Sequence, residues 1–124
     1  MNIPDDLQYT EDHEWIKIEN GTAAVGITDY AQSELGDIIF IELPEPGDEF
    51  NAKDSIGTIE AVKTVADIYS PMQGKISEVN PILEDEPECL NTDPYESGWI
   101  IKLTNFTCKD GDFLTADEYK KLIQ

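Results

Sequence analysis

Basic residues are scarce in this chain of 124 residues. Lysine and arginine together number 8, against 27 aspartates and glutamates, which gives a formal net charge of −19. Such a charge repels phosphate backbones and anionic lipid surfaces, so it argues against binding to nucleic acid or to a membrane. Two interpretations of the charge stay open: it keeps the protein in solution, or it guides docking to partners whose entrances are basic.

Cysteines and long apolar runs are equally scarce. Cys89 and Cys108 are the only cysteines and lack the spacing of a metal site, so we expect free thiols, although a disulfide between them stays open. No apolar run approaches the roughly 20 residues of a membrane-spanning helix, and residues 1–6 resemble neither a secretory signal nor an Arg-rich transit sequence. We therefore expect a soluble cytoplasmic protein of bacterial type, or a mitochondrial matrix protein if the chain is a processed eukaryotic one.

Groups for catalysis are lacking too. His13 is the single histidine, and no serine or cysteine forms a recognisable triad with it, so we interpret it as a structural residue beside Trp15. No other convergent set of acid, base and nucleophile is visible, so we expect a protein that is not an enzyme and holds no metal. Asp110-Gly111-Asp112 lacks the rest of a calcium loop and is interpreted as a turn.

What the sequence does contain is a series of short strands separated by turn signals, which predicts a single domain over residues 1–124. Strands are expected at residues 14–19, 22–27, 38–41, 55–62, 65–69, 75–79 and 99–103. Asn20-Gly21 predicts a hairpin between the first two strands. The unbroken apolar run at 38–41 predicts a strand that is buried on both faces, with Phe40 inside.

Helices are predicted at two places, and residues 81–98 are expected to be mostly loop. Residues 28–35 form the first helix, which Gly36 terminates. Thr115-Ala116-Asp117-Glu118 is a capping box that begins the second. The side chains expected to dock this second helix are Leu114, Tyr119 and Leu122. Together the elements predict an antiparallel β sandwich or flattened barrel with small peripheral helices and a C-terminal helix.

One lysine stands out by its position. Only Lys63-Thr64 separates two β-prone runs, residues 55–62 and 65–69, so Lys63 is predicted at the tip of a tight hairpin. A hairpin tip offers a modifying enzyme both an accessible amine and a fixed local backbone. The pattern therefore predicts a carrier whose working group is the Lys63 amine.

The segment from Gly57 to Gly74 resembles the lipoyl-lysine region of the H-protein family of the glycine cleavage system. Further matches to that family are residues 9–15 (YTEDHEW), 26–32 (GITDYAQ), 35–44 (LGDIIFIELP), 91–95 (NTDPY) and 98–99 (GW). Several motifs in one order and at one spacing make a specific match. The resemblance implies a fold of the lipoyl/biotinyl-carrier type, with lipoic acid in amide linkage to Lys63.

The resemblance also implies a set of partners. A lipoylating enzyme would attach the arm. The arm would then take the aminomethyl group of glycine from a pyridoxal-phosphate glycine decarboxylase (P protein) to a tetrahydrofolate-dependent aminomethyltransferase (T protein). A dihydrolipoyl dehydrogenase (L protein) would reoxidise it. The carrier, expected to be a monomer, would catalyse none of these steps.

In this family the arm lies back against the protein surface, and the resemblance implies an acidic group near its cleft. Glu14 is the candidate carboxylate and Ile27 a candidate wall residue. Asp67 is a further candidate, although Asp67 and Glu60 have the equally open interpretation of keeping the hairpin in solution.

Alternatives to a glycine-cleavage carrier differ in how well they fit. An H-like protein that relays lipoyl groups to other enzymes stays open, because the carrier chemistry is the same. A biotin carrier shares the architecture, but its lysine usually lies between two methionines, whereas Val62 and Thr64 flank Lys63. A lipoyl domain of a 2-oxo acid dehydrogenase would have a different tip and continue into linkers, where this sequence has a capped helix.

Overall fold

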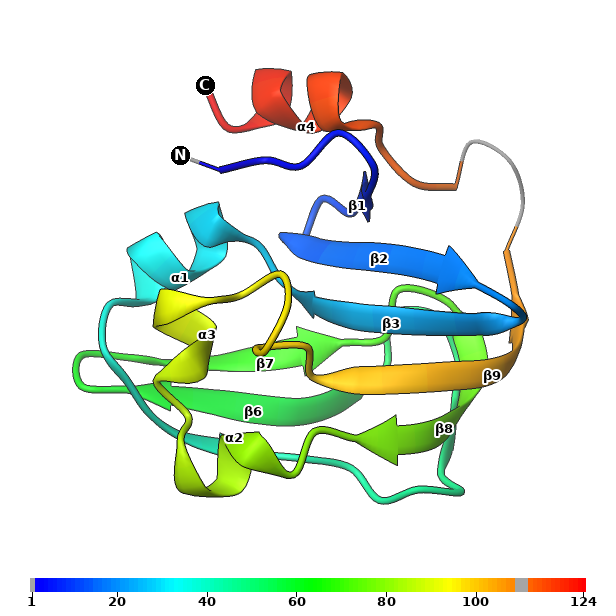
Figure 1. Ribbon diagram of the computed structural model, residues 1–124, viewed down its shortest axis with the longest axis horizontal. Helices are drawn as coiled ribbons and strands as arrows, with labels where there is room; N and C mark the ends of the chain where they lie inside the picture. Colours follow the sequence, from blue (N-terminus) through cyan, green and yellow to red (C-terminus); the bar gives the residue numbers. More distant parts are fainter. Residues whose placement is uncertain (1, 109–111) are drawn as a thin grey trace.

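The computed structural model describes residues 2–108 and 112–124, in which nine strands form two sheets (Figure 1). The larger sheet has the order β1-β2-β3-β9-β8-β5 and the smaller β4-β6-β7. The strands are β1 (Gln8–Tyr9), β2 (Glu14–Glu19), β3 (Thr22–Ile27), β4 (Ile38–Glu42), β5 (Glu49–Phe50), β6 (Ser55–Ala61), β7 (Val65–Tyr69), β8 (Gln73–Val79) and β9 (Ile101–Thr107). Every pairing is antiparallel, which confirms the predicted fold class.

The β2–β3 hairpin forms where the sequence predicts it. Asn20 and Gly21 connect the strands with φ angles of 50° and 76°. A type I′ turn needs positive φ at both central positions, and asparagine and glycine adopt it at low cost. Side chains alternate along β2, so Ile16 enters the main core while Trp15 packs in a second cluster.

The main core is built from both sheets. Its fully buried members include Ile16, Val25, Ile59, Ile68, Ile76 and Leu103. The second cluster joins the N-terminal segment to the C-terminal helix α4 (Ala116–Leu122), with the Tyr9 and Tyr119 rings stacked 4.8 Å apart. The two ends of the chain therefore lie side by side, as Figure 1 shows.

The prediction that residues 38–41 are buried on both faces is wrong. These residues do form β4, but only Ile38 and Ile41 are buried, while Ile39 and Phe40 are 56% and 51% exposed. The inner face of the smaller sheet packs on the main core, and a bulge between Ile38 and Phe40 interrupts the alternation. Two consecutive apolar side chains thus reach the protein surface.

Helix α1 (Asp29–Leu35) ends where predicted and begins one residue later than predicted, because Thr28 is its N-cap. The Ala31 N–H donates to the Thr28 hydroxyl, and Gly36 ends the helix with φ 79°. At the other end of the chain, Thr115 and Glu118 form the predicted capping box of α4. Its docking differs from the prediction in one residue, because Leu122 is 48% exposed and Ile123 packs on the second cluster instead.

The segment between β8 and β9 also departs from the prediction. Residues 81–98, expected to be mostly loop, contain the single-turn helices α2 (Ile82–Asp85) and α3 (Cys89–Thr92). The last strand begins at Ile101 rather than at Trp99.

Some sequence expectations concern absent features. The two cysteine thiols are free. Within residues 2–108 and 112–124, no His, Cys, Asp and Glu side chains form a group that could hold a metal ion. The longest helices of that part have 7 residues, and none could cross a membrane. The turn expected at Asp110-Gly111-Asp112 begins on residues outside the described part.

Candidate functional site

Lys63 stands at the β6–β7 connection, which lies at the left of Figure 1. The Ala61 N–H closes the turn by donating to the Thr64 carbonyl at 2.8 Å. Lys63 is exposed, as are its neighbours Val62 at 72% and Val65 at 62%. The amine is therefore displayed at a short hairpin tip that is open to an approaching protein.

A turn between α1 and β4 supports this tip. The Val62 N–H donates to the Asp37 carbonyl at 3.0 Å. Beside it, a Cβ atom placed on Gly36 would lie 3.2 Å from Lys63 Cε. The lysine stem thus rests against glycine backbone, where a larger residue would crowd it. The φ of 79° at Gly36 favours glycine for an independent reason.

The side chain of Asn91, on α3, fixes this turn in place. Its Nδ2 donates to the Gly36 carbonyl at 2.8 Å, and its Oδ1 accepts from the Ile38 N–H at 3.0 Å. The same Nδ2 also donates to Gln32 Oε1 at 3.0 Å. One amide group therefore bonds both sides of the turn that carries the tip. This role of Asn91 was not predicted from the sequence, where the family match at residues 91–95 was its only signal.

A cavity of about 340 Å³ lies between α1, the start of β2, the end of β3 and the smaller sheet. Glu14, Ile27 and Asp67, the three residues proposed for an arm cleft, all line it. The other lining residues are Asp12, His13, Tyr30, Ala31, Glu34, Leu35, Ile59, Ala66 and Ile68. Leu35 directly precedes Gly36, so the cavity begins next to the place where the Lys63 stem rests. We call this cavity the cleft.

Glu14 is the most deeply buried carboxylate of the cleft, with 3% of its surface exposed. The Thr10 hydroxyl donates to its Oε1 at 2.9 Å. Burial raises the pKa of Glu14 from 4.5 to about 7, and the Thr10 hydrogen bond offsets part of that shift. A carboxyl group in this condition ionises readily when a cation comes near, because an opposite charge favours the charged form.

His13 has different neighbours from those expected. Its Nδ1 lies 2.9 Å from the Tyr119 hydroxyl, and its ring packs on Tyr30 at 4.9 Å between centroids. Trp15 instead lies beside Tyr95, with ring centroids 6.2 Å apart. Burial lowers the pKa of His13 from 6.5, which favours the uncharged ring. His13 therefore forms part of the wall of the cleft, and the C-terminal helix holds its ring in place.

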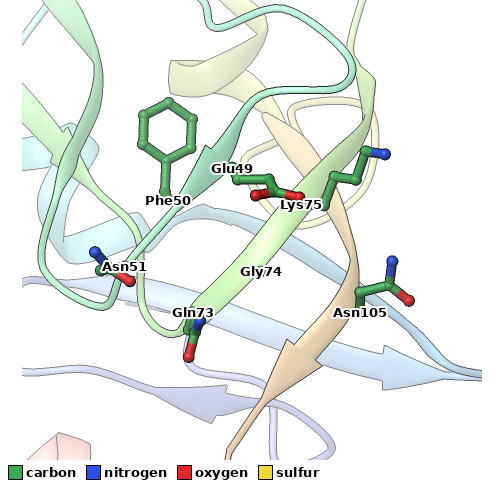
Figure 2. Close-up of a pocket in the computed structure, with 7 residues that line it drawn as sticks. All are labelled: Glu49, Phe50, Asn51, Gln73, Gly74, Lys75 and Asn105. Carbon is green, nitrogen blue, oxygen red and sulfur yellow. The ribbon is translucent and has the colours of Figure 1, made fainter.

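Two other lysines are placed less favourably for modification. Lys53 lies in the turn between β5 and β6, where its ammonium group pairs with Asp12 at 3.1 Å. Lys75 lies within β8 and lines a second cavity, of about 310 Å³, together with Glu49, Phe50 and Asn105 (Figure 2). That part of β8 lies across the molecule from the β6–β7 tip in Figure 1. Lys63 alone of the three combines a hairpin tip with a free approach.

The whole chain, and not the hairpin alone, is similar to known proteins of one family. The family model for the glycine cleavage H-protein matches residues 7–124. The chain belongs to this family. The glycine cleavage system H protein of Listeria innocua serovar 6a is 55% identical to it over 122 residues, which is 98% of each chain. That of Staphylococcus epidermidis strain ATCC 12228 is 50% identical and covers 99% of this chain and 98% of its own length.

A solved structure agrees with the H-protein assignment. The crystal structure of a glycine cleavage system H protein from Mycobacterium marinum has a TM-score of 0.88 and 41% identity, and covers 96% of this chain and 97% of its own. The resemblance inferred from the motifs is thereby confirmed. The chain is a lipoyl carrier of the glycine cleavage system, and it works with the other components of that system.

Proposed function

We propose that lipoic acid is joined to Lys63 Nζ by an amide bond and that the cleft shelters the loaded arm between visits to partner enzymes. The observation that carries this proposal is an exposed lysine at a rigid hairpin tip in a chain of the H-protein family. The bound lipoyl group supplies a disulfide whose sulfur takes up the aminomethyl group of glycine. The tip and the turn beneath it determine where that group can reach.

The surroundings of Lys63 fit such an attachment. Amide formation removes the positive charge of the lysine, and this breaks no ion pair within the described residues, because the pairs found there involve other lysines. Gly36 leaves room for the lysine stem along the path towards the cleft. The modified side chain can thus swing between the cleft and the solvent without a change in the fold.

The cleft suits a cargo with an apolar stem and a positively charged end. Ile27, Leu35 and Ile59 supply apolar walls, and the carboxylate of Glu14 supplies negative charge. An approaching ammonium group lowers the pKa of Glu14 and ionises it, which creates a charge-assisted contact where little water screens it. The walls keep water away from a group that hydrolyses in solvent.

We propose four enzymes as partners of the carrier. A lipoylating enzyme attaches the arm, and the P, T and L proteins then load, unload and reoxidise it. Membership of the H-protein family supports a carrier that leaves the chemistry to these enzymes.

Intact-mass measurement tests the attachment. Protein from a host that lipoylates should gain the mass of one lipoyl amide, mapped to Lys63, and its formal charge should move from −19 to −20 (−19 − 1). Lys63→Arg should stay unmodified, with a free energy of unfolding within about 0.5 kcal/mol of the parent, because an exposed tip has few packing contacts. Lys75→Arg is the matched control and should still be modified. A biotin mass, or modification at Lys53, would overturn the proposal.

A second experiment tests the cleft. Glu14→Gln should still be lipoylated at Lys63, but the loaded carrier, separated from its partners, should release formaldehyde and ammonia about tenfold faster. That factor corresponds to the loss of one charge-assisted contact of roughly 1.4 kcal/mol. Glu19→Gln, at an exposed position of the same strand, is the control. Equal release from the parent and Glu14→Gln would show that Glu14 does not protect the cargo.

A further inference from the structure

Exposed apolar side chains cluster on the outer face of the smaller sheet. Ile39 and Phe40 on β4 are 56% and 51% exposed, and Val65 on β7 is 62% exposed. Phe40 pairs with Glu60, and Glu60 pairs with Val65. Paired residues of neighbouring strands project to the same face, so Phe40 and Val65 flank Glu60 on one surface. Single exposed apolar residues are ordinary, but a group of them marks an interaction site.

The same face is acidic. In the next row of the sheet, Thr58 pairs with both Glu42 and Asp67. Glu42, Glu60 and Asp67 are all exposed. The strands β4, β6 and β7 contain no lysine or arginine. We call the surface formed by Ile39, Phe40, Glu42, Glu60, Val65 and Asp67 the outer face.

The outer face adjoins Lys63. Val65 begins the strand that leaves the tip, and the turn that supports Lys63 leads directly into β4. The hydrogen bond from the Val62 N–H to the Asp37 carbonyl, 3.0 Å long, ties the tip to that turn. On the inner side, Gly36 lies against the lysine stem and the cleft follows. An enzyme that approaches over the outer face therefore reaches the amine and meets the cleft only at Asp67, on the edge strand β7.

We propose that the outer face is the docking surface for the enzyme that attaches the lipoyl group to Lys63. This inference rests on the proposed attachment at Lys63. The P, T and L proteins can bind the lipoyl arm itself. The attaching enzyme meets an unmodified lysine and must recognise the protein surface around it. Its matching surface has an apolar centre for Phe40 and a rim of lysine or arginine for the three carboxylates. A second copy of this chain, with its own charge of −19, lacks that complementarity.

Steady-state lipoylation of the purified, unmodified carrier tests this surface. The probe is a lipoate-attaching enzyme supplied with lipoate and ATP, and the carrier concentration is varied. Phe40→Ser should raise the KM for the carrier roughly tenfold and leave kcat within about twofold, because the ring acts in binding and not at the reacting amine. Glu42→Lys should also raise KM and weaken its dependence on salt.

Matched controls lie on β2, away from the tip. Ile18→Ser replaces an apolar strand residue that is 40% exposed, and Glu19→Lys reverses an exposed charge. Both should keep the parent KM. Thermal unfolding of each variant verifies the fold, and Glu42→Lys tests the surface without touching the apolar side chains.

The outcomes separate the two proposals. If the parent is not modified at Lys63, the proposed attachment is contradicted, and the proposed docking surface is contradicted too. If the parent is modified and both outer-face variants keep the parent KM, the docking surface alone is overturned. It is also overturned if sedimentation shows a dimer of the parent that Phe40→Ser dissociates, because the face would then serve self-association.

Discussion

Glu14 links the deepest part of the cleft to the pH dependence of stability. Its pKa is about 7 in the folded protein and 4.5 as an unperturbed group. Below pH 4.5 both states hold the proton. Between pH 4.5 and 7 the unfolded chain releases it and the folded chain keeps it, so the free energy of unfolding falls as the pH rises through this window. Above pH 7 the loss is complete.

Glu14→Gln should remove this contribution. In urea unfolding, the variant should gain stability relative to the parent as the pH is raised from about 5 to about 8, because it has no proton to lose. Glu19→Gln, at an exposed position of β2, should follow the parent at both pH values. A difference between Glu14→Gln and the parent that does not change with pH would contradict the raised pKa.

The positions of single residues could be predicted from the sequence where those residues belong to a family motif. Glu14, Ile27 and Asp67 line one cavity, and only the family resemblance had suggested that they belong together. The error at His13 has a physical cause, since its hydroxyl partner Tyr119 lies 106 residues away in the sequence. Local patterns carry no information about such a contact.

Strand β4 allows its two faces to be compared by mutation. Ile41→Ala should lower the free energy of unfolding by about 2–5 kcal/mol, because Ile41 is 4% exposed and its loss leaves a cavity in the main core. Phe40→Ala should cost less than about 1 kcal/mol, because half of that ring is already in contact with solvent. Urea unfolding of the two variants measures the contrast. Equal losses would show that the outer face is covered in solution.

The turn between α1 and β4 depends on Asn91. Asn91→Ala leaves the Ile38 N–H and the Gly36 carbonyl without their partner, which should cost about 1–3 kcal/mol. Hydrogen exchange at the Val62 amide should also become faster, because its acceptor Asp37 belongs to the loosened turn. Thr92→Ala, which removes an exposed hydrogen bond of 3.4 Å, is the neighbouring control and should change neither quantity. An unchanged exchange rate at the Val62 amide in Asn91→Ala would show that the hairpin tip keeps its structure without support from the turn.

Elements with local signals were predicted well, and the others were not. Asn20-Gly21 and the Thr115 capping box determine their turns from neighbouring residues alone. Helices α2 and α3 have no side-chain cap and only 4 residues each, so no local sequence signal predicts them. The apolar run of β4 was misjudged because periodicity cannot tell whether a second layer covers a strand.

The charge of −19 acts over the whole surface and should govern encounter rates. Partners with basic entrances are attracted over distances that salt shortens, from a screening length of about 30 Å at 0.01 M to about 10 Å at 0.1 M. We therefore expect the association rate with the attaching enzyme to fall about tenfold or more between these salt concentrations. Stopped-flow fluorescence measures it, with Glu19→Lys as a control for a single distant charge. An association rate that does not change with salt concentration would show that the charge serves only to keep the protein in solution.

The meeting of the two chain ends has a consequence for how the fold is encoded. Asp5 and Lys120 form an ion pair of 3.7 Å, and Tyr9 stacks on Tyr119. A short glycine-serine linker could therefore close the backbone into a ring, and the ring could be reopened at Asn20-Gly21 to give a circular permutant. Such a permutant would keep every strand beside its present neighbours. The display of Lys63 depends on which strands are adjacent, not on which of them the ribosome makes first.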